Sequence, residues 1–315
     1  HSAGGSGYDG LVRITPDGRI HLHSGVGNLG TYSYAGTARA AAEVLKCRWE
    51  SCEIVRGSTD QHLPHASTQG GSNTIFTHTR TNWVAAEDAV TKLKQIAATE
   101  FGGNIDQYEI SNERVFKATD PEKGFSYAEA AARAIELGGE FSGQVYPDDI
   151  HPITQRAVQG IAGTGLIGVA KDNLPKRGIA PGLMISMAEV EIDLETGKHE
   201  VIDYIGIADC GTIIHPQGLS QQINGGAVWG FGMAASERHV YDPQNGLPAN
   251  IGLYQAKLPT IMDVPIKMAS GAVDIADPYN PAGGRGVGEP SQGSAVAAVT
   301  SAIADALGHS FNRVP

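Results

Sequence analysis

Two stretches of alternating hydrophobicity constrain the fold of this chain most strongly. Residues 11–23 alternate apolar and polar side chains on both sides of the turn sequence Thr15-Pro-Asp-Gly18, and residues 189–208 do so around Leu194-Glu-Thr-Gly197. A period of two places one face of a strand against a core, and a turn between two such runs predicts an antiparallel hairpin. The chain therefore contains at least two half-buried hairpins.

Helical patterns follow each hairpin. In the segment 83–101, apolar residues recur at the spacing of one buried helix face. The pattern Ser126-x-x-Glu129 is a capping box that opens a further helix, and glycines at 138 and 139 close it. The predicted helices are 35–45, 83–101, 126–138, 221–235 and 291–307.

The mixture of hairpins and helices predicts an α+β fold of two α/β lobes, with mixed or antiparallel sheets and packed helices. The 315 residues exceed the roughly 250–300 at which a single core stops growing. We expect one lobe at 1–145 and a second at 146–315, with the boundary in the loop-rich stretch 140–180. Glycine accounts for 41 residues, well above the usual ~7%, which indicates tight turns and close backbone approaches.

Charge and hydrophobicity exclude several partners. The net charge of −11 repels phosphate backbones, so no nucleic-acid partner is expected. The longest apolar stretch, 295–307, is interrupted by polar residues and is shorter than the ~20 residues of a membrane span. The first seven residues lack the basic and apolar regions of a signal peptide, so we expect a cytoplasmic protein. A periplasmic location is the alternative if a signal lies on a missing segment or on a partner.

Three cysteines, Cys47, Cys52 and Cys210, provide neither a disulfide framework nor a four-thiolate cluster, because their number is odd and no C-x-x-C pair exists. A redox role would need iron–sulfur or flavin centres on another polypeptide.

Two motifs have an alternative functional interpretation. The string Gly25-Val-Gly-Asn-Leu-Gly30 matches the dinucleotide pattern G-x-G-x-x-G, but the strand before it alternates and belongs to a hairpin. The first strand of a dinucleotide fold is instead a nearly continuous apolar run, which argues against this interpretation.

A zinc site is a second possibility, since His62-x-x-His65 with His78, His23 or Asp60 offers suitable ligands. The pair lies beside a proline and not on a helix face, and the chain contains eleven histidines. Surface or hydrogen-bonding roles are therefore favoured, and no metal ligand is assigned.

The most informative segment is Pro281-Ala-Gly-Gly-Arg-Gly-Val-Gly-Glu-Pro-Ser291, which precedes an apolar helix. One interpretation of this acid is that it stabilises the helix dipole from the first helical turn and has no further role. Four glycines within six positions exceed what capping requires and suit close approach of the backbone to a bulky ligand. A carboxylate at Glu289 suits general-base catalysis.

This segment resembles the G-V-G-E-P loop near the C-terminus of the molybdenum hydroxylases, the xanthine oxidase and aldehyde oxidase family. The resemblance extends along the chain and includes the hairpin 189–197. Further similar motifs, in the family's order, are Gln69-Gly-Gly-Ser72, Asp209-Cys-Gly-Thr-Ile-Ile-His-Pro216 and Gln221-Gln-Ile-Asn-Gly-Gly226.

The resemblance implies a molybdenum ion held by a pyranopterin dithiolene, as molybdopterin or its cytosine dinucleotide, and not by protein side chains. Glu289 would be the catalytic base, which takes a proton from the water-derived oxygen that attacks an electron-poor carbon. Gly288 would contact the cofactor from the same loop. The other implied cofactor-binding residues are Gly30, Thr31, Gly70, Gly71, Ser72, Gln221 and Gln222.

Three positions depart from the family pattern. The family usually has a G-Q-G loop beside the pterin, where this chain has Gly30-Thr31-Tyr32. His215 replaces an Asn before Pro216. Trp229 stands where many members have Gln or a smaller residue; it could narrow or stack a substrate, although packing is the favoured role.

The resemblance covers only the C-terminal half of the family's molybdopterin-binding large subunit. It implies that the chain works with an N-terminal molybdopterin-binding half or subunit, an iron–sulfur subunit with [2Fe-2S] clusters and an FAD subunit. The expected activity is hydroxylation of an aldehyde, aromatic or N-heteroaromatic substrate with oxygen from water. The alternatives are a redox-neutral hydratase or lyase on the same cofactor scaffold and a non-catalytic structural subunit.

Overall fold

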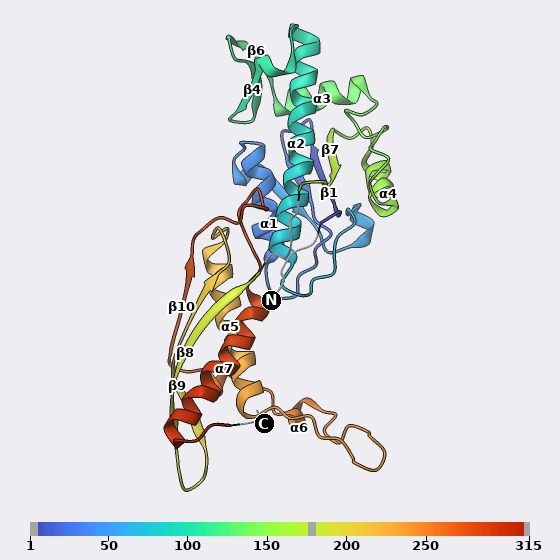
Figure 1. Cartoon of the computed structure of the whole chain (residues 1–315). Coiled ribbons are helices and arrows are strands. Elements are labelled where there is room, and N and C mark those ends of the chain that lie inside the picture. Colours follow the sequence, from blue (N-terminus) through green and yellow to red (C-terminus); the bar gives the residue numbers. More distant parts are fainter. Residues whose placement is uncertain (1–5, 176–180, 312–315) are drawn as a thin grey trace. The chain divides into compact units, whose positions relative to one another are not determined.

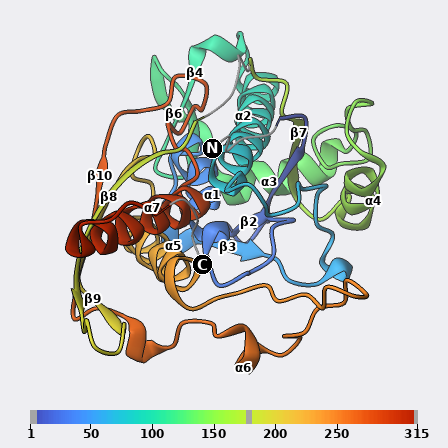
Figure 2. The same ribbon diagram turned by 60° about the horizontal axis from the view of Figure 1, so that its bottom comes forward.

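A computed structural model of the chain describes residues 6–175 and 181–311. These residues divide into two compact units, which Figures 1 and 2 show and which we describe separately. The N-terminal unit contains 6–175 and 276–285, and the C-terminal unit contains 181–275 and 286–311. The chain therefore leaves the C-terminal unit once and returns to it.

The N-terminal unit is built on a four-stranded sheet with the strand order β3-β2-β1-β7. The predicted first hairpin is confirmed, with Leu11 opposite His23 and Ile14 opposite Ile20. The strand β7 is antiparallel to β1, and β3 is parallel to β2. The strands are β1 (Asp9–Ile14), β2 (Ile20–His23), β3 (Cys52–Val55) and β7 (Leu166–Lys171).

The backbone of helix α2 packs directly against strands β1 and β7 of this sheet. A Cβ atom at Gly10 of β1 would lie 1.9 Å from the backbone oxygen of Thr81, and one at Gly168 of β7 would lie 2.4 Å from that of Ala85. Only glycine permits this approach. The helices are α1 (Ser33–Val44), α2 (Thr74–Phe101), α3 (Tyr127–Leu137) and α4 (Pro152–Ile161), and the unit contains the short 3₁₀ helices Trp49–Ser51, Thr59–Gln61 and Ile105–Gln107.

A small antiparallel sheet, β4-β5-β6, leads from α2 to α3. The hydrophobic pattern did not predict it, because its strands are short and rich in charge. The capping box at the start of α3 is confirmed, since the Ser126 hydroxyl accepts from the Glu129 N–H and the Glu129 carboxylate accepts from the Ser126 N–H. The strands are β4 (Tyr108–Ser111), β5 (Arg114–Lys117) and β6 (Asp120–Ser126).

Helix α2 begins nine residues before the predicted start at 83, because its first turns bury polar side chains. Residues 77–82 are all buried, and none of them is a large apolar residue. Their groups are hydrogen-bonded inside the unit: the Asn82 amide donates to the carbonyl of His78, and the Thr79 hydroxyl to that of Ile75. Periodicity of apolar residues cannot detect such a buried face.

Arg80 is the centre of this polar core. Its guanidinium and the Asp172 carboxylate form a two-pronged ion pair at 2.8 and 2.9 Å, and neither side chain is exposed. The same guanidinium donates to the carbonyls of Leu174 and Tyr279. The segment 276–285 is held further by Asn280, whose amide donates to the Thr79 hydroxyl at 2.7 Å. One residue of α2 thus joins β7 and a distant loop.

The C-terminal unit is a three-stranded sheet covered on one face by α5 and α7 (Figure 1). The predicted second hairpin is confirmed as β8 and β9, and β10 lies parallel to β9. Tyr204 packs edge-on against Phe231 with 5.2 Å between ring centroids. The elements are β8 (Leu183–Ile192), β9 (His199–Asp209), β10 (Lys267–Val273), α5 (Pro216–Ala235), α6 (Leu253–Ala256), α7 (Gly288–Leu307) and the 3₁₀ helix Ile261–Asp263.

The mixed sheets and packed helices confirm the α+β prediction, but the units divide later than the expected boundary at 145/146. The residues of α4 and β7 belong to the N-terminal unit because β7 pairs with β1 and α4 packs its apolar side on Leu11. The prediction that the first seven residues form no signal peptide falls partly on residues 1–5, which lie outside the described residues. Within 6–175 and 181–311, no helix is both long and apolar enough to cross a bilayer.

Removing the guanidinium at position 80 should destabilise the N-terminal unit severely. Arg80→Met leaves the Asp172 carboxylate buried without its partner, which typically costs about 3–5 kcal/mol. Urea unfolding monitored by circular dichroism measures this loss. The matched control is Arg133→Met, which breaks a solvent-accessible pair with Glu136 and should reduce the stability far less, because exposed ion pairs contribute little. Equal losses in the two variants would contradict the role given to Arg80.

Candidate functional site

The residues singled out by sequence divide between the two units. Gln221, Gln222, Gly288 and Glu289 belong to the C-terminal unit, and the group from Gly30 to Ser72 belongs to the N-terminal unit. Each group is considered within its own unit.

Glu289 is the second residue of α7, at the end of the glycine loop that the sequence indicated. The helix begins at Gly288, three residues before the predicted start, and Pro290 is accommodated because a proline in the first turn loses no helical hydrogen bond. No side chain caps this helix, and Glu289 is the one acidic residue of its first turn. The Glu289 side chain is half-buried.

Close packing fixes the first turn of α7. A Cβ atom at Gly226 of α5 would lie 2.6 Å from the carbonyl oxygen of Gly288, and one at Gly230 would lie 2.6 Å from the Cβ of Ala295. On another side, a Cβ at Gly182 would lie 2.7 Å from the ring of Pro290. Side chains at these glycines would displace the turn that carries Glu289. Gly226 of the Gln221–Gly226 motif therefore has a positional role.

The two glutamines lie on different faces of α5. Gln222 is half-buried and precedes Gly226 by one turn, so it lies on the face of α5 that meets α7. Gln221 shares a face with Gly225 and Trp229, and Gln221 and Trp229 are both exposed. Trp229 is 62% exposed, so core packing, the favoured role in the sequence analysis, does not explain it.

His215 takes over a capping function at the start of α5. Its ring Nδ1 accepts the backbone N–H of Gly218 at 2.9 Å, which is the interaction that an Asn side chain supplies at a helix N-cap. The replacement of Asn by His before Pro216 therefore preserves the helix start.

Two asparagines that the sequence analysis did not select each bury an unpartnered oxygen. Asn224 on α5 and Asn73 at the N-cap of α2 each have a buried side-chain oxygen without a hydrogen-bond partner within the described protein. Buried polar atoms in proteins are nearly always paired, so such atoms indicate a missing ligand or water. Their only sequence signal was their position: Asn224 lies inside the motif 221–226, and Asn73 directly follows the motif 69–72.

In the N-terminal unit, Gly30 and Thr31 lie in a loop before α1. Gly30 has φ 84°, and its N–H donates to the side-chain oxygen of Asn28 at 3.0 Å. The Thr31 hydroxyl is 3.0 Å from that of Ser33, which also accepts from the Gln69 amide at 3.4 Å. This contact brings the loop at 30–31 beside the segment 69–72. Gln69 supplies a side-chain amide next to a loop that has Thr in place of the family's Gln.

Residues Gly70, Gly71 and Ser72 form the entry to α2. Gly71 and Ser72 both adopt left-handed backbone conformations, with φ 65° and 53°. A serine in this region is strained, and strain of this kind gathers at ligand sites. No side chain caps the N-terminus of the 28-residue helix, and its first turn has no acidic residue.

The chemistry of this entry suits a phosphate-bearing cofactor. The first N–H groups of a helix and its dipole attract anions, and neither an acid nor a side-chain cap competes for them here. A Cβ at Gly70 would meet no atom within 4 Å, so the loop is open there. The uncapped helix and the open glycine fit the phosphate of the group that the resemblance implies. The unpartnered Asn73 oxygen is an acceptor and would pair with an N–H of that group or with water.

The histidines considered for zinc have other partners. His23 Nδ1 lies 3.0 Å from the carbonyl oxygen of His62, and His78 Nε2 lies 3.1 Å from the Ser67 hydroxyl. His65 stacks on His151 with 3.9 Å between ring centroids. Among the described residues, no three His, Cys, Asp or Glu side chains gather in a manner that could hold a metal ion.

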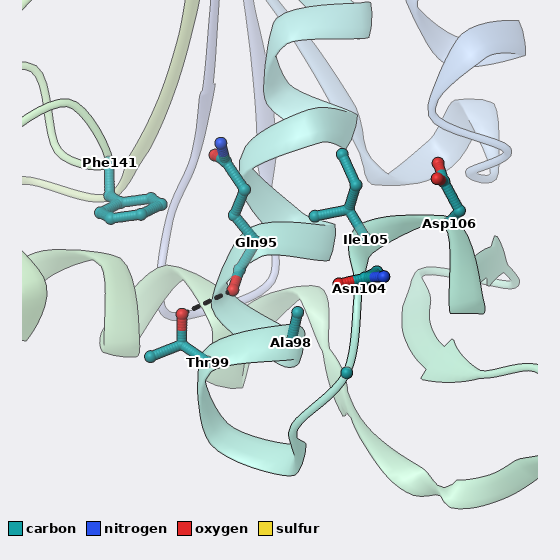
Figure 3. Close-up of a pocket in the computed structure, with 8 residues that line it drawn as sticks. Gln95, Ala98, Thr99, Asn104, Ile105, Asp106 and Phe141 are labelled. Atoms are coloured by element: carbon teal, nitrogen blue, oxygen red, sulfur yellow. Dashed lines mark hydrogen bonds between the residues drawn. The ribbon is translucent and has the colours of Figure 1, made fainter.

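A surface hollow of about 570 Å³ lies at the far end of α2 (Figure 3). Gln95, Ala98 and Thr99 line it from the helix, and residues 103–106 and Phe141 complete it. It contains none of the predicted site residues, and no titratable side chain other than Asp106 lines it.

The chain matches one known protein family over most of its length. The sequence pattern of the molybdopterin cofactor-binding domain matches residues 2–265. The chain belongs to this family. The predicted relationship with the xanthine oxidase type of molybdenum enzyme is confirmed.

Relatives share the whole length of the chain. The probable hypoxanthine oxidase XdhD of Escherichia coli strain K12 is 26% identical over 95% of this chain and 28% of that protein. The 6-hydroxypseudooxynicotine dehydrogenase complex subunit gamma of Paenarthrobacter nicotinovorans is 25% identical over 97% of this chain and 36% of that protein. The crystal structure of quinoline 2-oxidoreductase from Pseudomonas putida 86 matches with a TM-score of 0.73 and 27% identity, over 96% of this chain and 36% of that one.

A solved Cu,Mo-CO dehydrogenase gives a TM-score of 0.77 at 23% identity, over 98% of this chain and 37% of that chain, and shows the shared fold. The chain spans about a third of the length of these relatives.

Burial of two histidines should make the stability depend on pH. Desolvation lowers the pKa of both His78 and His23 to about 4. Below pH 6.5 the two histidines take up protons in the unfolded chain but not in the folded one. The free energy of unfolding therefore falls as the pH drops from 6.5 towards 4, by about 3 kcal/mol for each histidine. Above pH 6.5 this contribution is fully present. We expect His78→Gln to remove about half of this loss, measured by urea unfolding at a series of pH values.

His239→Gln provides the control, because this histidine is exposed. It should leave the pH profile of the wild type unchanged. A profile for His78→Gln that coincides with that of the control would contradict the assignment.

Proposed function

We propose that the chain is the C-terminal molybdopterin-binding part of a multi-subunit molybdenum hydroxylase, which oxidises an aldehyde, aromatic or N-heteroaromatic substrate with oxygen from water. The observation that carries the proposal is the fixed turn at the start of α7, where Glu289 stands alone as an acid between close contacts at Gly182 and Gly226. Family membership and the oxidases and dehydrogenases among the relatives support it.

Each unit, taken by itself, has residues that would contact the cofactor. In the N-terminal unit, the N–H groups at the start of α2, with Gly70, Gly71 and Ser72, would receive its phosphate, and the loop at Gly30 and Thr31 would lie beside the pterin. In the C-terminal unit, Gln222, Gln221 and Gly288 would contact its polar edge. The molybdenum–pyranopterin group, when bound, supplies the two-electron oxidation.

The chain itself would supply a base. The Glu289 carboxylate would accept a proton from the water-derived oxygen as that oxygen attacks the substrate carbon. Because α7 cannot shift towards α5 or Gly182, the carboxylate keeps its position during this transfer. Exposed Trp229, two turns along α5 from Gln221, would offer an aromatic face to a flat substrate.

Replacing the carboxylate tests this role directly. Glu289→Gln in the assembled complex should retain molybdenum and lose turnover by a factor of about 10²–10⁴, because the amide cannot accept the proton. The measurements are metal content and reduction of an artificial electron acceptor when substrate is added. Glu195→Gln, in the exposed turn between β8 and β9, is the control and should keep the wild-type rate.

Near-normal turnover in Glu289→Gln would remove the residue from the catalytic role. Substrate consumption without dye reduction in the wild type would favour a hydratase or lyase, and a complex without molybdenum or pterin would favour a structural subunit.

The segment between α5 and β10 supports the need for a partner chain. We define the arm as residues 237–266, which Figure 1 shows as the orange segment around α6. Its large apolar side chains are poorly covered, and those at least three quarters exposed are Ile251, Leu253, Tyr254, Ile261, Met262 and Ile266. A concentration of exposed large apolar side chains in one segment is typical of an interaction surface. We infer that the arm contacts the N-terminal molybdopterin-binding half or subunit that the resemblance implies; the region matched here is only about a third of the relatives' length.

Charges in the arm should prevent assembly without unfolding the chain. The double variant Tyr254→Asp/Ile261→Asp should reduce the molybdenum-containing complex recovered with the tagged chain by about tenfold, because each carboxylate would be desolvated at the interface. Its unfolding free energy should change by at most about 0.5 kcal/mol, since both side chains are exposed.

Leu194→Asp, which changes an equally exposed apolar side chain in the β8–β9 turn, is the control. It should assemble as the wild type does. Full recovery of the complex with the double variant would show that the arm is not the contact. Subunits that carry iron–sulfur clusters or FAD would be identified in the same preparations by their absorption spectra and their mass.

A further inference from the structure

Two of the three cysteines meet in the N-terminal unit. The Sγ atoms of Cys47 and Cys52 are 3.6 Å apart, across the connection between α1 and β3. Both side chains are partly exposed, whereas Cys210 is buried. The spacing C-x₄-C gave no indication of this contact, because the turn that follows α1 was not predicted.

The turn between the two cysteines is held by residues outside it. The Glu113 carboxylate accepts from the backbone N–H of Arg48 at 3.1 Å and from the Ser51 hydroxyl at 2.5 Å. The hydroxyl of buried Tyr127 donates to the carbonyl of Leu45 at 2.6 Å, which fixes the end of α1. These contacts keep the two sulfur atoms together in the reduced protein, so little chain entropy is lost when they bond.

We propose that Cys47 and Cys52 are a redox-active dithiol that closes to a disulfide by exchange with a small-molecule disulfide. Cys52 attacks one sulfur of that disulfide as a thiolate, its S–S bond breaks, and one small thiolate leaves. Cys47 then attacks the Cys52 sulfur of the mixed disulfide, gives its proton to solvent, and releases the second thiolate. Two protein thiols are oxidised and the small disulfide is reduced to two thiols.

The surroundings support Cys52 as the attacking sulfur. The hydrogen bond between the two sulfur atoms lowers the pKa of the Cys52 thiol and outweighs burial and the nearby carboxylates of Glu113 and Glu50, which raise it. The same hydrogen bond, together with burial, raises the pKa of Cys47 well above its usual range. The attacking thiol is the one with the larger thiolate fraction, and the other resolves the mixed disulfide.

Closure ties the end of α1 to the start of β3 by a covalent bond. The helix α1 begins just after the loop at Gly30 and Thr31, and β3 is the edge strand beside β2. The disulfide would therefore stiffen the layer that follows this loop. The inference does not depend on the proposed hydroxylase activity.

Mass spectrometry of the purified protein after incubation with oxidised glutathione tests the proposal. The wild type should lose two hydrogen atoms and keep no glutathione, and dithiothreitol should restore the original mass. Cys47→Ser should instead retain one glutathione on Cys52, because the resolving thiol is absent. Cys52→Ser should not lose two hydrogen atoms, because no second thiol of the pair remains to form the disulfide.

Cys210→Ser is the control and should behave as the wild type. Far-ultraviolet circular dichroism verifies that each variant is folded. A wild type that accumulates a glutathione adduct, or that shows no change while Cys47→Ser is modified, would overturn the proposal. So would the absence of modification in both.

Discussion

The N-terminal unit depends on an ion pair that no water reaches. Arg80 and Asp172 are fully buried, and the remaining guanidinium donors serve backbone carbonyls from two other segments. An unpaired charge there would be far costlier than a lost surface contact, so these segments must close together around Arg80. This requirement places the loop 276–285 on α2, and the glycines that lead to Glu289 continue directly from that loop.

Patterns that rest on local physics were predictable from the sequence. Both hairpins and the capping box at Ser126 were found because alternation and turn chemistry act over a few residues. The position of Glu289 in the first turn of a helix was found for the same reason, although that helix starts earlier than its apolar pattern. The motifs 69–72 and 221–226 were located by resemblance, and the close contacts of Gly226 and the strained φ of Ser72 give these motifs a physical basis.

Features that depend on long-range pairing could not be derived. The first turns of α2 contain Thr, His, Arg and Asn, a composition typical of a surface segment. These residues are buried because Asp172 and Asn280, which are distant in sequence, form hydrogen bonds with them. The boundary between the units was placed too early because the pairing of β7 with β1 joins residues more than 150 positions apart. The exposure of Trp229 was also hidden, since an aromatic residue in an apolar helix usually indicates a core.

The order in which the segments enter the two units affects how the chain can be divided. A polypeptide that stops at residue 275 would contain every strand of the N-terminal unit but lack the loop that accepts from Arg80 and bonds to Thr79. It would also lack α7, the helix that covers the sheet of the C-terminal unit beside α5. Neither unit is thus encoded by one continuous piece of sequence. Ribosomal synthesis must pass residue 285 before the N-terminal unit can be complete, and it must pass α7 before the C-terminal unit can be.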